Sequence, residues 1–185
     1  MKQVIASLKS VAPISFSRYH NVEKLEKELH DDYEKRTWRS RMHVNKDNKV
    51  FIPANMFKNC LSECAKYLSI QVPGKGKSLY TKHFEAGVMV TDPLVLDVSP
   101  GDVEGEWLHV PSDGRRGGTK RVPKCFPFIP EWAGDVIYYV FDETITEDVF
   151  KYVLEESGRF IGIGSFRPRN NGYKGRYEVE ELVFG

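Results

Sequence analysis

A run of glycines and cations late in the chain is the part best suited to bind an anion. Between Gly158 and Tyr177 there is no acidic residue. Glycine lets backbone N–H groups approach phosphate oxygens closely, and neighbouring arginines and lysines add positive charge. We therefore predict that this loop binds nucleic-acid phosphates. The residues that we assign to the contact are Gly162, Gly164, Phe166, Arg167, Arg169, Lys174 and Arg176.

Three other stretches combine several cations with almost no acids. In the first, the cations interleave with a tryptophan, which suits phosphate contact and base stacking. The second is a glycine-containing connector and the third a glycine-rich finger. The residues predicted to bind nucleic acid in them are Arg36, Trp38, Arg39 and Arg41, then Lys75, Lys77 and Lys82, then Arg115, Arg116, Lys120 and Arg121. Arg18, in a polar segment after the first strand, joins this set.

Plainer interpretations of two stretches stay open. The first is explained equally well as a solvated helix end whose cations complement the helix dipole. The third is explained as a disordered hairpin tip that its charge keeps soluble.

The overall charge requires that these stretches come together. The 185 residues carry 27 Lys and Arg against 26 Asp and Glu, a formal net charge of +1. A chain so close to neutral binds nucleic acid only if folding segregates its cations onto one face. We expect the four stretches to form one groove for a sugar-phosphate backbone. The aromatic residues available to stack on bases there are Trp38, Tyr80, Phe166 and Tyr173.

The histidines offer an enzymatic alternative. His20, His43 and His83 each lie close in sequence to arginine or lysine, and His20 and His43 are the two that we would mutate first. Either could deprotonate an RNA 2′-hydroxyl while a cation stabilises the phosphorane, which would give cleavage without a metal ion. Isolated histidines on polar loops are more often simply exposed, and no H-x-H pair or acidic cluster accompanies these. We favour a non-catalytic binding protein.

Cysteine usage and hydropathy point to no cofactor and no membrane. The three cysteines are an odd number without a C-x-x-C pair, which supports neither a disulfide framework nor a zinc site. No apolar leader and no membrane-length apolar run is present. We expect a soluble cytoplasmic protein without metal or cofactor.

The elements that must position these residues form one predicted domain, 1–185, with insertions at about 20–48 and 91–130. Without the insertions they read strand, helix, strand, strand, helix, strand. This is the order of a ferredoxin-like α+β domain, an antiparallel sheet with helices on one face. The longer insertion has no sustained period and predicts an irregular excursion.

Three helices are predicted, each from a different sequence pattern. Helix 53–68 carries Phe57, Cys60, Leu61 and Cys64 on one face. A later helix begins at Thr144, whose spacing to Glu147 indicates a capping box. Its core face is formed by Val149, Val153, Leu154, Phe160 and Ile161. Residues 21–38 predict a surface helix packed by a narrow stripe of Val22, Leu25, Leu29 and Tyr33.

Four strands complete the pattern. Residues 3–16 alternate loosely and read as a first strand interrupted near Pro13, and residues 84–90 and 135–141 read as further strands. In the last strand the apolar alternation slips at Glu180 and Glu181, which predicts a bulge or the end of pairing.

Two segments resemble the RAMP superfamily (repeat-associated mysterious proteins), which includes subunits of CRISPR effector complexes. IPANMFKNCLSECAKYL resembles its short strand, proline turn and first helix. GRFIGIGSFRPRNNGYKGRYEV resembles its glycine-rich loop before the last strand, and also the end of small uncharacterised phage-encoded proteins.

The resemblance implies an RRM-like core that holds single-stranded RNA, or DNA, against its sheet and glycine-rich loop, with the central excursion as a thumb. It implies a homo-oligomer along a strand or a subunit of a ribonucleoprotein complex. It leaves two alternatives: a metal-independent RNA endonuclease, and an interaction or assembly subunit that binds no nucleic acid, including one that interferes with a CRISPR complex.

Overall fold

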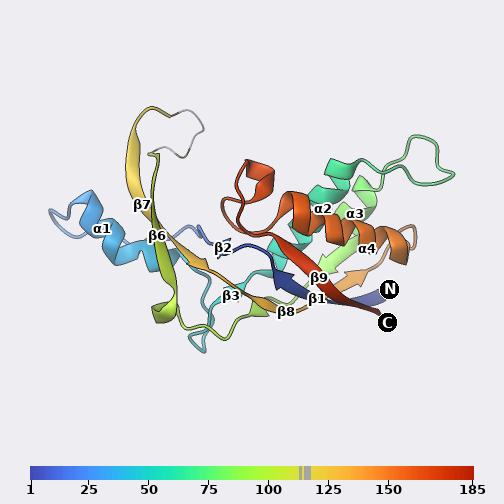
Figure 1. The fold of residues 1–185 in the computed structure, drawn as a ribbon, viewed down its shortest axis with the longest axis horizontal. Coiled ribbons are helices and arrows are strands. Elements are labelled where there is room, and N and C mark those ends of the chain that lie inside the picture. Colours follow the sequence, from blue (N-terminus) through green and yellow to red (C-terminus); the bar gives the residue numbers. More distant parts are fainter. Residues whose placement is uncertain (113, 115–117) are drawn as a thin grey trace.

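A four-stranded antiparallel sheet with helices on one face forms the body of the protein (Figure 1). The computed structural model describes residues 1–112, 114 and 118–185. In order across the sheet, the strands are β4 (Val88–Val90), β8 (Ala133–Val140), β1 (Lys2–Ser10) and β9 (Tyr177–Phe184). Helices α2 (Ala54–Leu68) and α4 (Glu147–Glu156) pack against each other. The predicted α+β, ferredoxin-like order is confirmed.

Helix α2 has the predicted buried face, since Phe57, Cys60, Leu61 and Cys64 are all at most 1% exposed. Burial raises the pKa of the Cys60 thiol to about 11 and that of Cys64 to about 12. Both thiols are therefore protonated core groups at neutral pH. Like Cys125, they are unpaired.

Helix α4 departs from the sequence prediction at both ends. Its cap is Thr146, whose hydroxyl accepts from the Val149 N–H, so the capping box from Thr144 is wrong. The chain leaves α4 through a π-helical turn, Ser157–Ile161. The wider turn shifts the apolar phase, so that Ile161 is buried while Phe160 is 45% exposed. Phe160 is therefore not a core residue.

The slip predicted in the last strand is a bulge. Ser7 pairs with Glu181 but Leu8 pairs with Val179, which leaves Glu180 as the extra residue of β9. The bulge keeps Val179 and Leu182 packed against the core on either side of the two glutamates.

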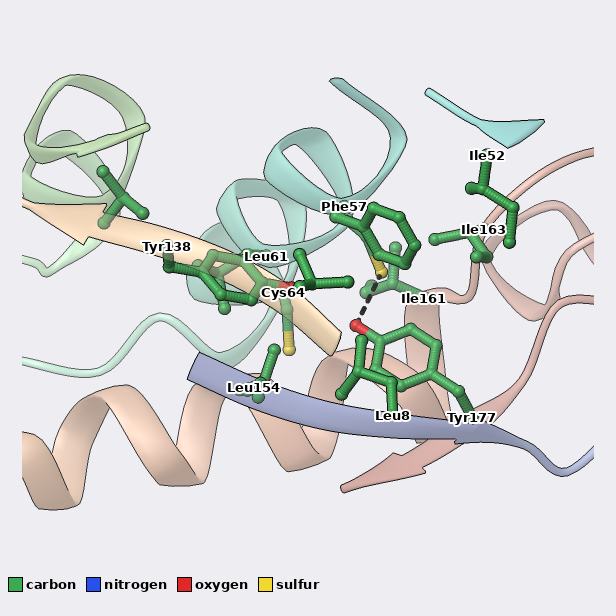
Figure 2. Close-up of a cluster of buried hydrophobic side chains, with 14 of the residues drawn as sticks. Leu8, Ile52, Phe57, Leu61, Cys64, Tyr138, Leu154, Ile161, Ile163 and Tyr177 are labelled. Carbon is green, nitrogen blue, oxygen red and sulfur yellow. Dashed lines mark hydrogen bonds between the residues drawn. The ribbon is translucent and has the colours of Figure 1, made fainter. Parts of the chain in front are cut away.

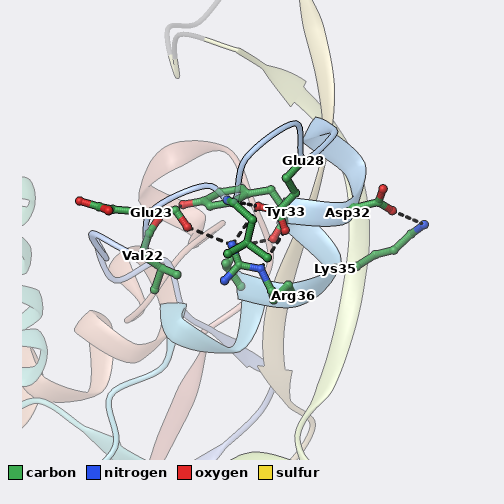
Figure 3. A network of polar contacts seen from close by, with 9 residues as sticks. Val22, Glu23, Glu28, Asp32, Tyr33, Lys35 and Arg36 are labelled. Atoms are coloured by element: carbon green, nitrogen blue, oxygen red, sulfur yellow. Dashed lines mark hydrogen bonds and ion pairs between the residues drawn. The ribbon is translucent and has the colours of Figure 1, made fainter.

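Two predicted elements are largely replaced. Helix α1 covers only His30–Thr37, followed by a 3-10 turn, Trp38–Arg41. The predicted apolar stripe does not pack against the body of the protein: Leu25 and Leu29 are 62% and 70% exposed. A polar network replaces it, with Arg36 bound to the Glu28 carboxylate and the Glu23 carbonyl (Figure 3).

The strand predicted at 84–90 is mostly helix. Helix α3 (Thr81–Gly87) takes up the first half and β4 only the second. Tyr80 and Phe84 are both buried at the helical i, i+4 spacing. Gly87 lies against Asp142, where a Cβ would come within 2.4 Å of the aspartate Cβ.

The insertion predicted to be irregular contains a regular β-hairpin that rises from the body (Figure 1). Its strands β6 (Glu104–Pro111) and β7 (Arg121–Ile129) pair from Glu104↔Phe128 to Pro111↔Arg121. The prolines in these strands hide the alternation in the sequence. Smaller pairings are made by β2 (Ile14–Ser15) with β7, and by β3 (Phe51–Ile52) with β5 (Leu94–Val95).

The core under α2 and α4 anchors both ends of the glycine-rich loop (Figure 2). Ile161 and Ile163, where the loop begins, are buried with Phe57 and Leu8. Where the loop ends, the Tyr177 hydroxyl lies 2.5 Å from the Ser157 hydroxyl and 3.6 Å from the Cys60 sulfur. Among the described residues, no helix is long and apolar enough to cross a membrane.

Candidate nucleic-acid interface

The glycine-rich loop is a tightly closed structure. A Cβ on Gly172 would lie 1.8 Å from the Phe166 carbonyl oxygen, and one on Gly175 would lie 1.8 Å from that of Ile163. Only glycine permits these close backbone approaches. The loop is also tied to the segment after β1, since Ser165 N–H donates to the Ser15 carbonyl at 2.8 Å. The loop therefore holds a fixed position relative to residues 15–18.

Two adjoining cavities lie over this junction, and we call them together the cleft. The α2 cavity, ≈ 370 Å³, lies between the loop and the start of α2. The hairpin cavity, ≈ 1000 Å³, lies between the loop, α1 and the β-hairpin. The residues that line both are Ser17, Arg18, Gly164, Ser165 and Arg167. The cleft therefore centres on two arginines from segments that are far apart in the chain.

Arg18 is the freest of these charges. Its side chain is exposed and forms no ion pair with any described residue, while its backbone N–H donates to the Arg41 carbonyl at 3.0 Å. Arg167 points its guanidinium to Glu63 of α2 at 2.8 Å. Lys124 of β7 lines the opposite wall and has no ion-pair partner in the described part of the chain. An anion in the cleft therefore meets an excess of positive charge.

The start of α2 adds to this field. Pro53 is the N-cap and supplies no side-chain hydrogen bond, so the first N–H groups of α2 lack a side-chain cap at the α2 cavity. A helix N-terminus carries partial positive charge and favours anions.

Both candidate histidines line the cleft. His43 lies in the α2 cavity and His20 in the hairpin cavity. Burial and then the charge of Arg41 lower the pKa of His20, and burial and then Arg18 lower that of His43. Both imidazoles are therefore neutral at neutral pH. The buried Nδ1 of His20 has no hydrogen-bond partner among the described residues.

The cations around α1 are engaged elsewhere. Arg41 is buried and holds both oxygens of the Glu34 carboxylate, at 2.6 and 3.0 Å, although its edge lines the hairpin cavity. Arg36 is bound to Glu28 at 2.8 Å. Each of these two predicted phosphate contacts therefore already has a carboxylate partner in this structure.

The predicted stacking residue Trp38 is also unavailable. It is 9% exposed and packs under Gly105 of the hairpin, with the Arg39 guanidinium 4.0 Å from its ring centroid. Tyr80 is buried in the body at 3%.

The glycine-rich loop itself uses several predicted contacts for structure. Lys174 is 3% exposed, forms an ion pair with Glu106 of β6, and lies near the rings of Phe128 and Phe166. Arg176 donates to the Arg159 carbonyl, beside a separate cavity. Arg167, Arg169 and Lys174 of the loop are thus opposed by acids from distant segments, which sequence proximity did not reveal.

The four stretches do not all gather into one groove: Arg41, Lys124 and Arg167 bring three of them to the hairpin cavity, and the second stays apart. Lys75, Lys77 and Lys82 lie on and before α3, at the end of the molecule opposite the hairpin in Figure 1. Lys120 and Arg121 stand at the end of the hairpin, where Arg121 donates to the His109 carbonyl. Arg115 and Arg116 lie outside the described residues.

Sequence reasoning missed several groups in the cleft. Tyr19 is 86% exposed at the hairpin cavity, next to Arg18 and His20. Asn55 and Asn59, one helical turn apart on α2, line the α2 cavity. The polar segment after the first strand could have indicated Tyr19. The two asparagines gave no signal, because the helix that carries them was predicted from its apolar face alone.

Known structures share this architecture. No family model and no curated protein sequence matches the chain. Cmr6 from Pyrococcus furiosus superposes with a TM-score of 0.51 at 12% sequence identity, over 96% of this chain and 97% of Cmr6. This chain has the fold of Cmr6. A chain of the type III-B Cmr-beta complex bound to cognate target RNA superposes with a TM-score of 0.50 at 15% identity, over 99% of this chain and 60% of that one.

The two segments that resemble the RAMP superfamily, helix α2 and the glycine-rich loop, meet at the α2 cavity. The resemblance and the cleft therefore involve the same part of the molecule.

Proposed function

We propose that this protein is a non-catalytic subunit of a ribonucleoprotein complex of the CRISPR type, and that it holds single-stranded RNA in the cleft. The observation that carries the proposal is the position of Arg18 and Arg167 at the border of the two cavities, above a loop closed by glycines. A backbone phosphate between them would be bound by two guanidinium groups.

The walls of the cleft favour an unpaired strand. Tyr19 and Phe166 line the hairpin cavity, and aromatic rings stack on bases only where those bases are exposed. The hydroxyls of Ser17 and Ser165, 2.6 Å apart, supply groups that can bind a ribose 2′-hydroxyl. The fold likeness to an RNA-bound Cmr complex supports RNA over DNA as the natural strand.

The same fold supports assembly. We propose that the protein joins other subunits, or copies of itself, along one strand. Kinship with phage-encoded proteins, and with it interference with a host complex, stays a prediction.

The histidines favour a second candidate, a metal-independent RNA endonuclease. His43 lines the same cavity as Arg18 and Arg167, and its lowered pKa leaves it able to accept a proton. No acid is paired with His43 among the described residues: the His–Asp pairs are His83 of α3 with Asp142, at 2.6 Å, and His30 with Asp31, at 3.7 Å.

The deciding experiment is binding of labelled single-stranded RNA to the purified chain at low and high salt. Salt-sensitive binding that falls in Arg18→Ala supports the proposal. An RNA that stays free at low salt contradicts it.

A further inference from the structure

Two exposed aromatic rings lie in contact near the end of α2 that is remote from the cleft. Tyr67 of α2 is 51% exposed and Phe160 of the π-helical turn is 45% exposed. Their ring centroids are 5.7 Å apart with 34° between the planes. Large rings that pair with each other and still face solvent form a ready stacking surface. We call this pair the aromatic platform.

A continuous chain of contacts joins the platform to the cleft. Arg167, which lines both cavities, is bound to Glu63 at 2.8 Å. The other oxygen of Glu63 accepts from Arg169 at 3.1 Å. The Arg169 guanidinium lies 5.9 Å from the centroid of Tyr67. Each step is a direct contact, so the platform has a defined position relative to the cleft.

Helix α2 supplies the path between them. Asn55, Asn59, Glu63 and Tyr67 are spaced four residues apart and form one ridge of the helix. Asn55 and Asn59 border the α2 cavity at one end, and Tyr67 ends the ridge at the other. Twelve residues of α-helix cover ~18 Å, which a stacked strand would span with roughly five nucleotides.

The charge along this path suits an anionic guest. Glu63 is neutralised by two arginines, Arg167 and Arg169. At the platform, Glu156 is paired with Arg159, whose side chain is 70% exposed. The cations therefore outnumber the carboxylates, and a cation beside an aromatic ring is the arrangement that holds a stacked base and its phosphate.

We propose that the aromatic platform is a second binding site, on which bases of the single strand stack after the strand leaves the cleft along α2. The inference rests on the proposed function, because it extends the same strand. It adds two residues, Tyr67 and Phe160, that sequence reasoning did not assign to binding.

The test compares a short and a longer oligouridine, of about 4 and about 12 nucleotides, a range that single-strand sites cover. Dissociation constants are measured for the full chain, Tyr67→Ala, Phe160→Ala and the control Tyr152→Ala. Tyr152 is an equally exposed tyrosine on α4, 48% exposed, outside this path. We expect the platform variants to bind the longer oligomer about tenfold more weakly and the short one unchanged.

A second variant keeps the test independent of folding. Tyr67→Trp retains a ring, and its added fluorescence should fall when the longer oligomer binds and stay constant with the short one. If the unchanged protein binds neither oligomer, the proposed function itself fails. If it binds both but Tyr67→Ala and Phe160→Ala match Tyr152→Ala, the platform is overturned and the cleft stands. Loss of self-association in Tyr67→Ala with RNA binding intact would likewise overturn it, as a protein contact.

Discussion

The Arg41 guanidinium donates to both oxygens of the Glu34 carboxylate, at 2.6 and 3.0 Å, beneath the β-hairpin. Glu34 also accepts from the Cys125 N–H at 2.7 Å, and Arg41 donates to the Cys125 carbonyl at 3.0 Å. This pair therefore ties α1 and the turn after it to β7. It fixes one wall of the hairpin cavity.

Breaking the Arg41–Glu34 pair should lower the free energy of unfolding. In Arg41→Ala the Glu34 carboxylate stays buried without its partner, which costs about 3–5 kcal/mol. Urea denaturation of the variant measures the loss. The matched control is Lys35→Ala, which removes the exposed Lys35–Asp32 pair at 3.6 Å and should leave the midpoint unchanged. Equal midpoints for Arg41→Ala and the unchanged protein would contradict the buried link.

Arg18→Ala should weaken binding of RNA whatever the base sequence of the RNA. Arg18 has no ion-pair partner among the described residues, so its charge is available to one phosphate. The slope of log affinity against log salt should therefore fall by about one. Arg36→Ala is the control, because Arg36 is already bound to Glu28 at 2.8 Å. A similar effect of the two changes on the slope would remove Arg18 from the site.

Gly172→Ala should disturb the glycine-rich loop. The added Cβ would meet the Phe166 carbonyl oxygen at 1.8 Å, and backbone cannot move aside cheaply. We expect a loss of roughly 2 kcal/mol, or about 6 °C in Tm for a chain of this size. Gly101→Ala is the control, since a Cβ there meets nothing within 4 Å. Weakened RNA binding in Gly172→Ala alone would connect the loop's closure to the cleft.

Stability should depend on pH through His20. Its folded-state pKa lies below the ordinary value of 6.5, so the unfolded chain takes up a proton more readily. This stabilising contribution is present above pH ~6.5 and is lost as the pH falls through the folded-state pKa. Thermal unfolding from about pH 7.5 to about pH 5 should show the decline, and His20→Gln should make it shallower. An unchanged pH profile in His20→Gln would assign the decline to other groups.

RNA should stay intact in the presence of the protein. The cleft offers His43 a neighbouring cation but no orienting acid among the described residues. Prolonged incubation with a chelator, followed by gel analysis, checks this. Cleavage that disappears in His43→Ala but persists in His83→Ala would favour the endonuclease.

Short-range residue patterns in the sequence were enough to predict much of the fold. The apolar spacing of Phe57, Cys60, Leu61 and Cys64 gave α2, and the slip at Glu180 gave the bulge of β9. Both are set by residues within a few positions of one another, where periodicity is informative. The sequence also placed the glycine-rich loop between the last helix and the last strand.

The tertiary structure alone decided which cations remain free. Glu63 meets Arg167 and Arg169, and Glu106 meets Lys174, across separations of about a hundred and of 68 residues. An ion pair needs proximity in space, and a stretch without acids in sequence can still fold against them. The same long-range packing buried Trp38 and exposed Phe160, since the hairpin covers one and the π-helical turn rotates the other outward. Arg18 and Arg167 came together for the same reason, through backbone contacts between segments that lie at opposite ends of the chain.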